Sequence, residues 1–165
     1  MSILVGFTTT QIQGLTTTTI GVLSTTDMRA LASTQLAALT TTQVAVLSST
    51  QLAALTSTQV SALETTDLAV LATTQLRGFG SAQLVGLTTT QLGALTTTQL
   101  EGLTSTQAGA LTTTQVAALT TTQISGFGST QIAGLTSGQV ASLTTTKVGA
   151  LTTTQIGALT TAQIR

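Results

Sequence analysis

One spacing constrains this chain more than any other property: a large apolar residue stands at every eighth position. The series runs from Phe7 to Leu159 without a slip. A second apolar series with the same spacing runs from Leu4 to Ile164 and is weakened only at Ala108. Self-similarity at a fixed period is the signature of a solenoid or array. We therefore predict a single repeat array of about twenty octads over residues 1–165, with no terminal capping repeats.

The offset between the two apolar series separates a helix from a strand. Val116 precedes Leu119 by three residues and follows Leu111 by five. Both separations are odd, so a strand would place the two series on opposite faces. On a helix, positions i and i+3 share a face. One continuous helix fails, because eight residues at 3.6 per turn overshoot two turns by roughly 80° and the apolar stripe would wind around the rod.

Each octad also carries the start signals of its own helix. In the octad that begins at Leu111, Thr112 is a candidate N-cap and Gln115 follows three residues later. Together they form the Ser/Thr-x-x-Glu/Gln capping box, in which each side chain accepts from the other residue's backbone N–H. Leu111 and Val116 occupy the two positions of a hydrophobic staple. The recurring pattern predicts a short helix that restarts every eight residues.

A few octads depart from this pattern. At the box position, Asp27 and Asp67 replace Gln with an anion, which also suits a helix N-terminus. Thr19 fits the box less well, and the helix pattern gives no account of Lys147 there. Three cap positions hold poor N-cap residues, namely Ala32, Glu64 and Ala72.

The predicted fold is all-α: a solenoid of very short helices, one per octad, each about seven residues and roughly 10 Å long. Leu and Ile or Val face inward and the Thr hydroxyls face outward. We expect three or four octads per superhelical turn, with hairpin pairs of sixteen residues as the alternative. The alternative fold is a β-solenoid with a Thr-rich face, because Thr, Ile and Val favour strands. That fold would suggest an ice-binding or adhesive function.

Small residues fill the position just before each large apolar residue, as at Gly86, Ala94 and Gly134. They allow close backbone approach, which predicts tight helix–helix packing; a ligand groove is the functional alternative. Each Gly within a short helix costs roughly 1 kcal/mol relative to Ala, so packing or turn geometry must require it.

The side-chain inventory argues against catalysis, and we predict that the protein is not an enzyme. Cys and His are absent, so the many Ser and Thr hydroxyls have no evident activating base. Two clusters hold charges close together, Asp27 with Arg29 and Glu64 with Asp67. A carboxylate pair three residues apart lacks the ligand count of a calcium loop, so we interpret both clusters as structural. The prediction is no catalytic, cofactor-binding or metal-binding residue, and no cofactor.

Charge excludes several classes of partner. Four basic and four acidic residues balance to a net charge of zero, and no basic stripe could neutralise phosphates. No apolar run approaches the roughly 20 residues that span a bilayer. A neutral surface lacks the repulsion that keeps proteins monomeric, which favours self-association, end to end or laterally. We expect no nucleic-acid, membrane-spanning or small-molecule partner, and either stacking of the open ends or a longer parent array.

The octads of the form Leu-Thr-Thr-Thr-Gln-(Ile/Val/Leu)-x-x resemble the Thr- and Gln-rich repeat tracts of large bacterial secreted or surface proteins of the adhesin or haemagglutinin type. The resemblance covers essentially the whole chain and concerns repeat character, so it carries over no site residue. It implies an extracellular structural or adhesive role, and we expect a segment of a filament or surface fibre. The N-terminal stretch, with no positive residue before its apolar run, is not a convincing signal peptide.

Overall fold

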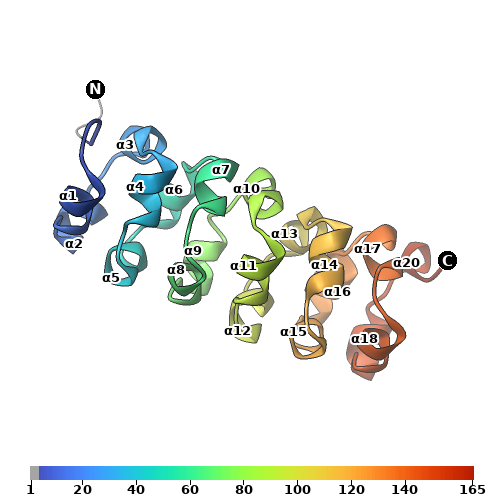
Figure 1. Cartoon of the computed structure of the whole chain (residues 1–165). Helices are drawn as coiled ribbons and strands as arrows, with labels where there is room; N and C mark the ends of the chain where they lie inside the picture. Colours follow the sequence, from blue (N-terminus) through green and yellow to red (C-terminus); the bar gives the residue numbers. More distant parts are fainter. Residues whose placement is uncertain (1–3) are drawn as a thin grey trace.

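The computed structural model describes residues 4–165, and their secondary structure consists of short α-helices joined by extended turns (Figure 1). In chain order the helices are α1 (Thr9–Gln13), α2 (Thr17–Gly21), α3 (Thr25–Ala30), α4 (Ser33–Ala37), α5 (Thr41–Ala45), α6 (Ser49–Ala53), α7 (Ser57–Ser61), α8 (Thr65–Ala69), α9 (Thr73–Leu76), α10 (Ser81–Gly86), α11 (Thr89–Gly93), α12 (Thr97–Glu101), α13 (Ser105–Ala110), α14 (Thr113–Ala118), α15 (Thr121–Ser125), α16 (Ser129–Gly134), α17 (Ser137–Ala141), α18 (Thr145–Gly149), α19 (Thr153–Gly157) and α20 (Thr161–Ile164). The all-α prediction is confirmed. The described residues contain no strand, so the alternative β-solenoid is wrong.

The helices begin where the capping pattern predicts. Thr112 has extended backbone angles (φ −74°, ψ 158°) and its hydroxyl accepts from the backbone N–H of Gln115 at 3.1 Å. The Gln115 Oε1 accepts in return from the N–H of Thr112 at 2.8 Å. Thr is a strand former by propensity, but here its hydroxyl satisfies a helix N-terminus. The capping register therefore overrides the strand preference of the Thr run.

The helices are shorter than predicted, with four to six residues instead of about seven. The large apolar residue and the cap residue of an octad both have extended backbone angles, as at Leu111 (φ −59°, ψ 149°) and Thr112. This break turns the chain between helices, so the apolar residues of every octad return to the same interior.

The octads coil into an elongated superhelix in which each helix packs on the helix three places later. This contact recurs along the whole chain, from α1 with α4 to α17 with α20. Figure 1 shows the result as a rod, with the two ends of the chain at opposite ends of the long axis. The contacts define three columns of stacked helices, which agrees with the expectation of three or four octads per turn. The sixteen-residue hairpin alternative is wrong, because it would pair neighbouring helices instead.

Small residues permit the closest contacts within these columns. A Cβ built on Gly86 would lie 2.8 Å from the Ser57 Cβ, and one on Gly134 would lie 2.5 Å from the Ser105 carbonyl oxygen. Both distances are shorter than a real Cβ contact allows. The prediction of tight packing is therefore confirmed at these positions. The Gly residues are not left-handed helix caps, because among the described residues only Gly6 has a positive φ.

The two apolar series form one continuous core along the axis. Their members are buried from Ile20 to Leu135, including Ala108 at 0% exposure. Burial weakens in the last turns, where Val148 is 39% exposed and Ile156 is 41% exposed. The core is thus made by stacking successive turns, since each turn covers the apolar side chains of its neighbours.

Candidate functional site

The described residues contain no group of three or more His, Cys, Asp or Glu side chains that could hold a metal ion. Within the same part of the chain, no helix has the length and apolar character needed to cross a bilayer. The feature that recurs with defined chemistry is the Gln at the box position.

The Gln at the box position has a second bonding role that the sequence pattern did not reveal. The Oε1 of Gln99 accepts from the N–H of Thr96 at 2.9 Å, as the capping box requires. The Nε2 of the same amide donates to the carbonyl oxygens of Leu68 at 2.9 Å and Leu71 at 2.7 Å. These carbonyls lie at and just beyond the C-terminal end of α8, four helices earlier. The Leu68 carbonyl also accepts from the backbone N–H of Leu71 at 3.3 Å. One amide therefore starts its own helix and caps the end of another.

This arrangement repeats along the rod, and we call it the glutamine ladder. Its members are Gln35, Gln43, Gln51, Gln59, Gln75, Gln83, Gln91, Gln99, Gln107, Gln115, Gln123, Gln131, Gln139, Gln155 and Gln163. Each donates to the carbonyl 28 residues earlier, and most also reach the carbonyl 31 or 30 residues earlier. All but the part-exposed Gln75 are classed as buried. Since each link joins one turn of the superhelix to the next, the ladder is the polar counterpart of the apolar core.

The sequence did contain a signal for this second role. A capping box accepts Glu as readily as Gln, because only an acceptor oxygen is needed. This chain has Gln in most octads and Glu in none of the box positions. A carboxylate has no N–H to donate, whereas an amide has two. The exclusion of Glu therefore indicates that the box position must donate as well as accept.

Lys147, which the capping pattern left unexplained, keeps the donor function of the ladder. Its ammonium donates to the carbonyl oxygen of Ala117, 30 residues earlier. The helix α18 has a hydroxyl cap from Thr144 but no reciprocal box bond, because Lys has no acceptor. The cation also lies near the C-terminal end of α14, where the helix dipole favours positive charge.

Asp67 keeps the acceptor function instead. Its Oδ2 accepts from the N–H of Glu64 at 3.1 Å, and its side chain is only 2% exposed. Burial raises the pKa of Asp67 above its usual value of 3.8, opposed by the hydrogen bond from Glu64 and reinforced by the Glu64 charge. An ionised Asp67 has no proton with which to reach the carbonyls of α4. The predicted structural role of this pair is thus capping, with half of the ladder function missing.

The earliest box positions lie outside the ladder for a geometric reason. Gln11, Thr19 and Asp27 have no residue 28 positions before them in this sequence. Thr19 shares a hydroxyl–hydroxyl hydrogen bond with Thr16 at 2.9 Å, and the Asp27 carboxylate accepts from the N–H and hydroxyl of Ser24. The box side chains of Thr19 and Asp27 therefore bond within their own caps.

Two arginines link the turns in the opposite direction. The Nε of Arg29 donates to the carbonyl of Ala54 at 3.2 Å, and that of Arg77 donates to Gly102 at 2.7 Å. Each acceptor is the C-cap residue of the helix three places later. Arg29 therefore links two turns of the superhelix, which agrees with the structural role predicted for its cluster.

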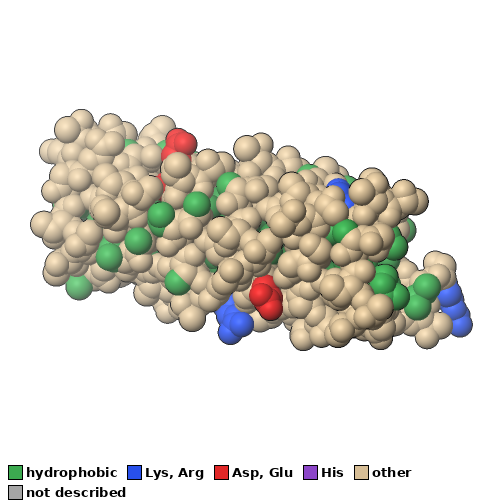
Figure 2. Space-filling model, turned by 90° about the horizontal axis from the view of Figure 1, so that it is seen from below, with side chains coloured by type: hydrophobic (Ala, Val, Ile, Leu, Met, Phe, Trp, Pro, Cys, Tyr) green, Lys and Arg blue, Asp and Glu red, His purple; other side chains and the backbone are tan. Residues whose placement is uncertain are grey.

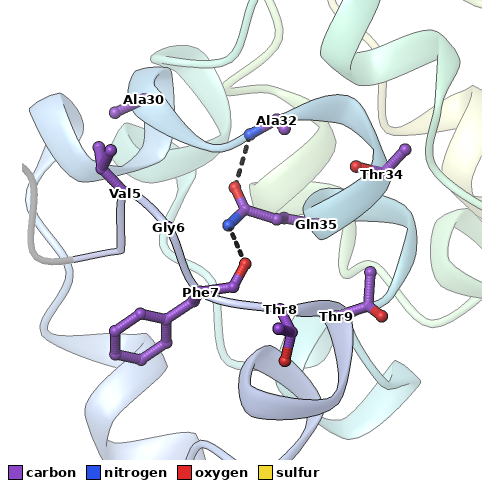
Figure 3. A pocket seen from close by; sticks show the side chains of 9 residues that line it. All are labelled: Val5, Gly6, Phe7, Thr8, Thr9, Ala30, Ala32, Thr34 and Gln35. Atoms are coloured by element: carbon purple, nitrogen blue, oxygen red, sulfur yellow. Dashed lines mark hydrogen bonds between the residues drawn. The ribbon is translucent and has the colours of Figure 1, made fainter.

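A hollow of about 420 Å³ lies near the N-terminal end of the rod (Figure 3). Its lining includes the Phe7 ring and the Thr8 and Thr34 side chains, and none of the described residues that line it is charged. The Gln35 amide crosses it, accepting from the N–H of Ala32 and donating to the carbonyl of Phe7 (Figure 3). The hollow thus belongs to the first rung of the ladder.

The surface of the rod is mostly uncharged. Figure 2 shows one long face covered by polar, uncharged side chains and backbone, with isolated charged groups and scattered apolar ones. The exposed Thr side chains lie mainly in the first turn of each helix, as at Thr41 and Thr89. The outward position predicted for the Thr residues beyond the cap is confirmed, whereas the cap hydroxyls are bonded within the octad.

A family model for the ALTTAQ repeat matches residues 20–57, 60–97, 89–121 and 117–145. These matches together span most of the chain. The chain belongs to the ALTTAQ repeat family. The Thr/Gln-rich repeat character inferred from the sequence is confirmed by this match, and the ladder explains the Gln that gives the ALTTAQ repeat its last letter. No curated protein and no solved structure matches the chain.

Proposed function

We propose that this ALTTAQ repeat array is a structural rod that serves as a segment of an extracellular filament or surface fibre. The observation that carries the proposal is the glutamine ladder joined to a continuous core. Most octads add the same donor, acceptor and apolar surface, so the rod extends by repetition without a new kind of contact. A protein of this design supplies length and a uniform surface, and we assign it no catalytic role.

The two end turns of this chain support the proposed self-association. At one end, Leu151 and Leu159 are only partly buried, and Ile164 is 69% exposed. At the other end, Phe7 and Leu15 are partly buried in the same way. The last carbonyls and the Gln11 amide are the same acceptor and donor types that interior turns bring together. We propose that a second copy of the chain covers each end and continues the ladder across the junction.

The extracellular location rests on resemblance and composition. The Thr/Gln-rich octads resemble tracts of bacterial surface proteins, and the adhesin-like context is part of this proposal. The sparse charge gives the rod no basic stripe for nucleic acid. Antibody labelling of intact, unpermeabilised cells tests the location, since an intracellular protein would be labelled only after permeabilisation.

The assembly is tested by sedimentation velocity of the purified chain over a hundredfold concentration range, with negative-stain microscopy of the same samples. We expect the average mass to rise with concentration and rods longer than one chain to appear. Ile164→Glu places a charge on the exposed end face and should suppress both effects. Val85→Glu is the matched control, because Val85 is 48% exposed in α10, away from the ends.

A strictly monomeric wild-type chain would remove the assembly proposal. Equal suppression by both variants would also contradict it, because association would then depend on general surface hydrophobicity. Circular dichroism of the variants checks that the helices remain folded.

A further inference from the structure

Three octads carry Val at a place where all the others carry a smaller residue. The position just before each large apolar residue holds Val22, Val46 and Val70 in these octads, and Gly, Ala or Ser in every other. The three Val side chains are 77%, 44% and 44% exposed, so they add little to the core. Val also has a lower helix propensity than Ala. Neither the core nor the local helix therefore accounts for these side chains.

The three Val residues lie in one column of the rod, one turn apart. They are the C-cap residues of α2, α5 and α8, and α2 packs on α5 as α5 packs on α8. The exposed residues Ala45 and Ala69 precede Val46 and Val70. We call Val22, Ala45, Val46, Ala69 and Val70 the valine row. Figure 2 shows apolar side chains in an oblique row over the end of the rod that holds these helices.

The valine row differs from the rest of the described surface. No other exposed large apolar residue of the described helices has a similar one on a helix that packs against its own, as Val85 in α10 and Val148 in α18 illustrate. The helices α2 and α5 carry no charged residue, and α8 carries only the buried Asp67. An exposed, uncharged apolar stripe of this kind is typical of a surface that contacts another protein.

The spacing of the valine row indicates which protein that is. Successive Val residues are one turn of the superhelix apart, so a partner contacts all three only if its own apolar groups repeat with the same pitch. A second copy of this chain has that pitch. The uncharged row also offers no electrostatic pattern that would select an unlike protein. Identical patches on two copies form a self-complementary contact with two-fold symmetry.

The charges beside the row favour an antiparallel pair. Glu64 is exposed at the N-terminus of α8, the helix that ends at Val70. A parallel pair would bring the two Glu64 carboxylates to the same level, where they repel each other. Arg29, which is exposed in α3, lies at nearly the same sequence distance from Val46 as Glu64 does, on the other side. An antiparallel pair therefore brings each Glu64 to the level of the partner's Arg29.

We propose that two copies of the chain pair laterally through their valine rows, with Val46 against the partner's Val46 and Val22 against the partner's Val70. Because the row runs obliquely to the long axis, the paired rods cross each other (Figure 2). This contact goes beyond the proposed end-to-end assembly and does not depend on it. One row is a small contact of the transient class, and chains joined end to end present several rows, whose contacts reinforce one another.

Cysteine cross-linking tests the lateral pair, because the chain has no Cys of its own. Every variant also carries Ile164→Glu, which is designed to suppress end-to-end joining. During oxidation with diamide, Val46→Cys should form a disulfide-linked dimer about tenfold faster than Val85→Cys, since pairing raises the effective concentration of the thiol. Val85 is the matched control, because it is 48% exposed in α10 and lies outside the valine row.

Two further variants test the antiparallel arrangement. A mixture of Val22→Cys and Val70→Cys should form mixed dimers, identified by mass spectrometry, whereas each variant alone should react no faster than Val85→Cys. Equal rates for Val46→Cys and Val85→Cys would overturn the lateral pair. Faster dimer formation by Val22→Cys alone than by the mixture would overturn the antiparallel arrangement. These rates do not involve the ends of the rod, so the lateral pair and the end-to-end assembly succeed or fail separately.

Discussion

Asp67 and Lys147 both stand at the box position of their octads, and each keeps one of the two hydrogen-bonding roles that Gln has there. Asp67 keeps the acceptor role and Lys147 keeps the donor role. Asp67 accepts from the N–H of its own cap residue, Glu64, but brings no donor to the preceding turn. Lys147 donates to Ala117 in the preceding turn, but leaves the N–H of its cap residue without the box bond. Gln does both with one planar amide, as Gln99 shows.

This comparison separates two contributions to stability: the hydrogen bond that the box side chain accepts within its own helix, and the hydrogen bonds that it donates to the preceding turn. The acceptor half belongs to the local helix and is available as soon as that helix forms. The donor half joins residues about thirty positions apart and exists only in the stacked rod. A substitution at one box position can therefore remove either the accepted or the donated hydrogen bond. The two losses of unfolding free energy should differ in size and in pH dependence.

The largest effect on stability should come from replacing a ladder Gln with Glu, which has a carboxylate like that of Asp67. Gln99→Glu should cost about 3–5 kcal/mol at neutral pH, because it leaves an unpaired buried charge against carbonyl oxygens. At about pH 3.5 most of the loss should disappear, since a protonated Glu can donate to a carbonyl while its other oxygen accepts from Thr96. Urea unfolding at both pH values measures the difference. A loss that is independent of pH would show that the donor half is unimportant.

Removing both halves without adding charge should cost somewhat less. Gln99→Leu leaves the N–H of Thr96 and the carbonyl of Leu71 without the Gln99 amide, at about 1–3 kcal/mol for each buried group that stays unsatisfied. The carbonyl of Leu68 keeps the backbone N–H of Leu71. We expect a total of about 2–4 kcal/mol with no dependence on pH. Urea unfolding beside wild type gives the value, and an unchanged midpoint would contradict the ladder as a source of stability.

Repairing the defect at position 67 should stabilise the rod. Asp67→Gln should gain about 1–2 kcal/mol at neutral pH, measured by urea unfolding, because the amide supplies a donor toward the preceding turn. Because burial raises the pKa of Asp67 in the folded state, folding binds a proton there. The wild-type contribution is therefore best below the usual value near 3.8 and is lost as pH rises through the raised pKa. The advantage of Gln should shrink toward acidic pH, and a constant advantage would contradict the burial of Asp67.

The smallest effect should come from repairing Lys147. Lys147→Gln restores the box bond to Thr144 and keeps a donor for Ala117, so we expect a gain of about 0.5–1 kcal/mol. Lys147→Met removes the donor as well and should fall below wild type. Thermal unfolding of the three proteins at one pH ranks them. If the Met variant equals wild type, the ammonium contributes nothing to the stack.

Local residues were enough to predict the octads, the helix starts and the all-α class. Thr112, Gln115, Leu111 and Val116 lie within six positions of one another, and their cap, box and staple depend only on neighbours in the chain. Helix length was overestimated because the residue before each cap is extended as well as the cap. The absence of a catalytic residue, the extracellular location and the self-association remain predictions.

By itself, then, the sequence determined where each helix starts, which residues face the axis, and that the chain is a repeat array. These properties follow from residue spacings of one octad or less. The tertiary structure decided which octads meet. The three-helix stacking rule, the Gly contacts such as Gly134 on Ser105, and the reach of each Gln amide to carbonyls 28–31 residues away are consequences of the superhelix. No local rule fixes the angle between successive helices, so only the packed rod shows which carbonyls each Gln amide reaches.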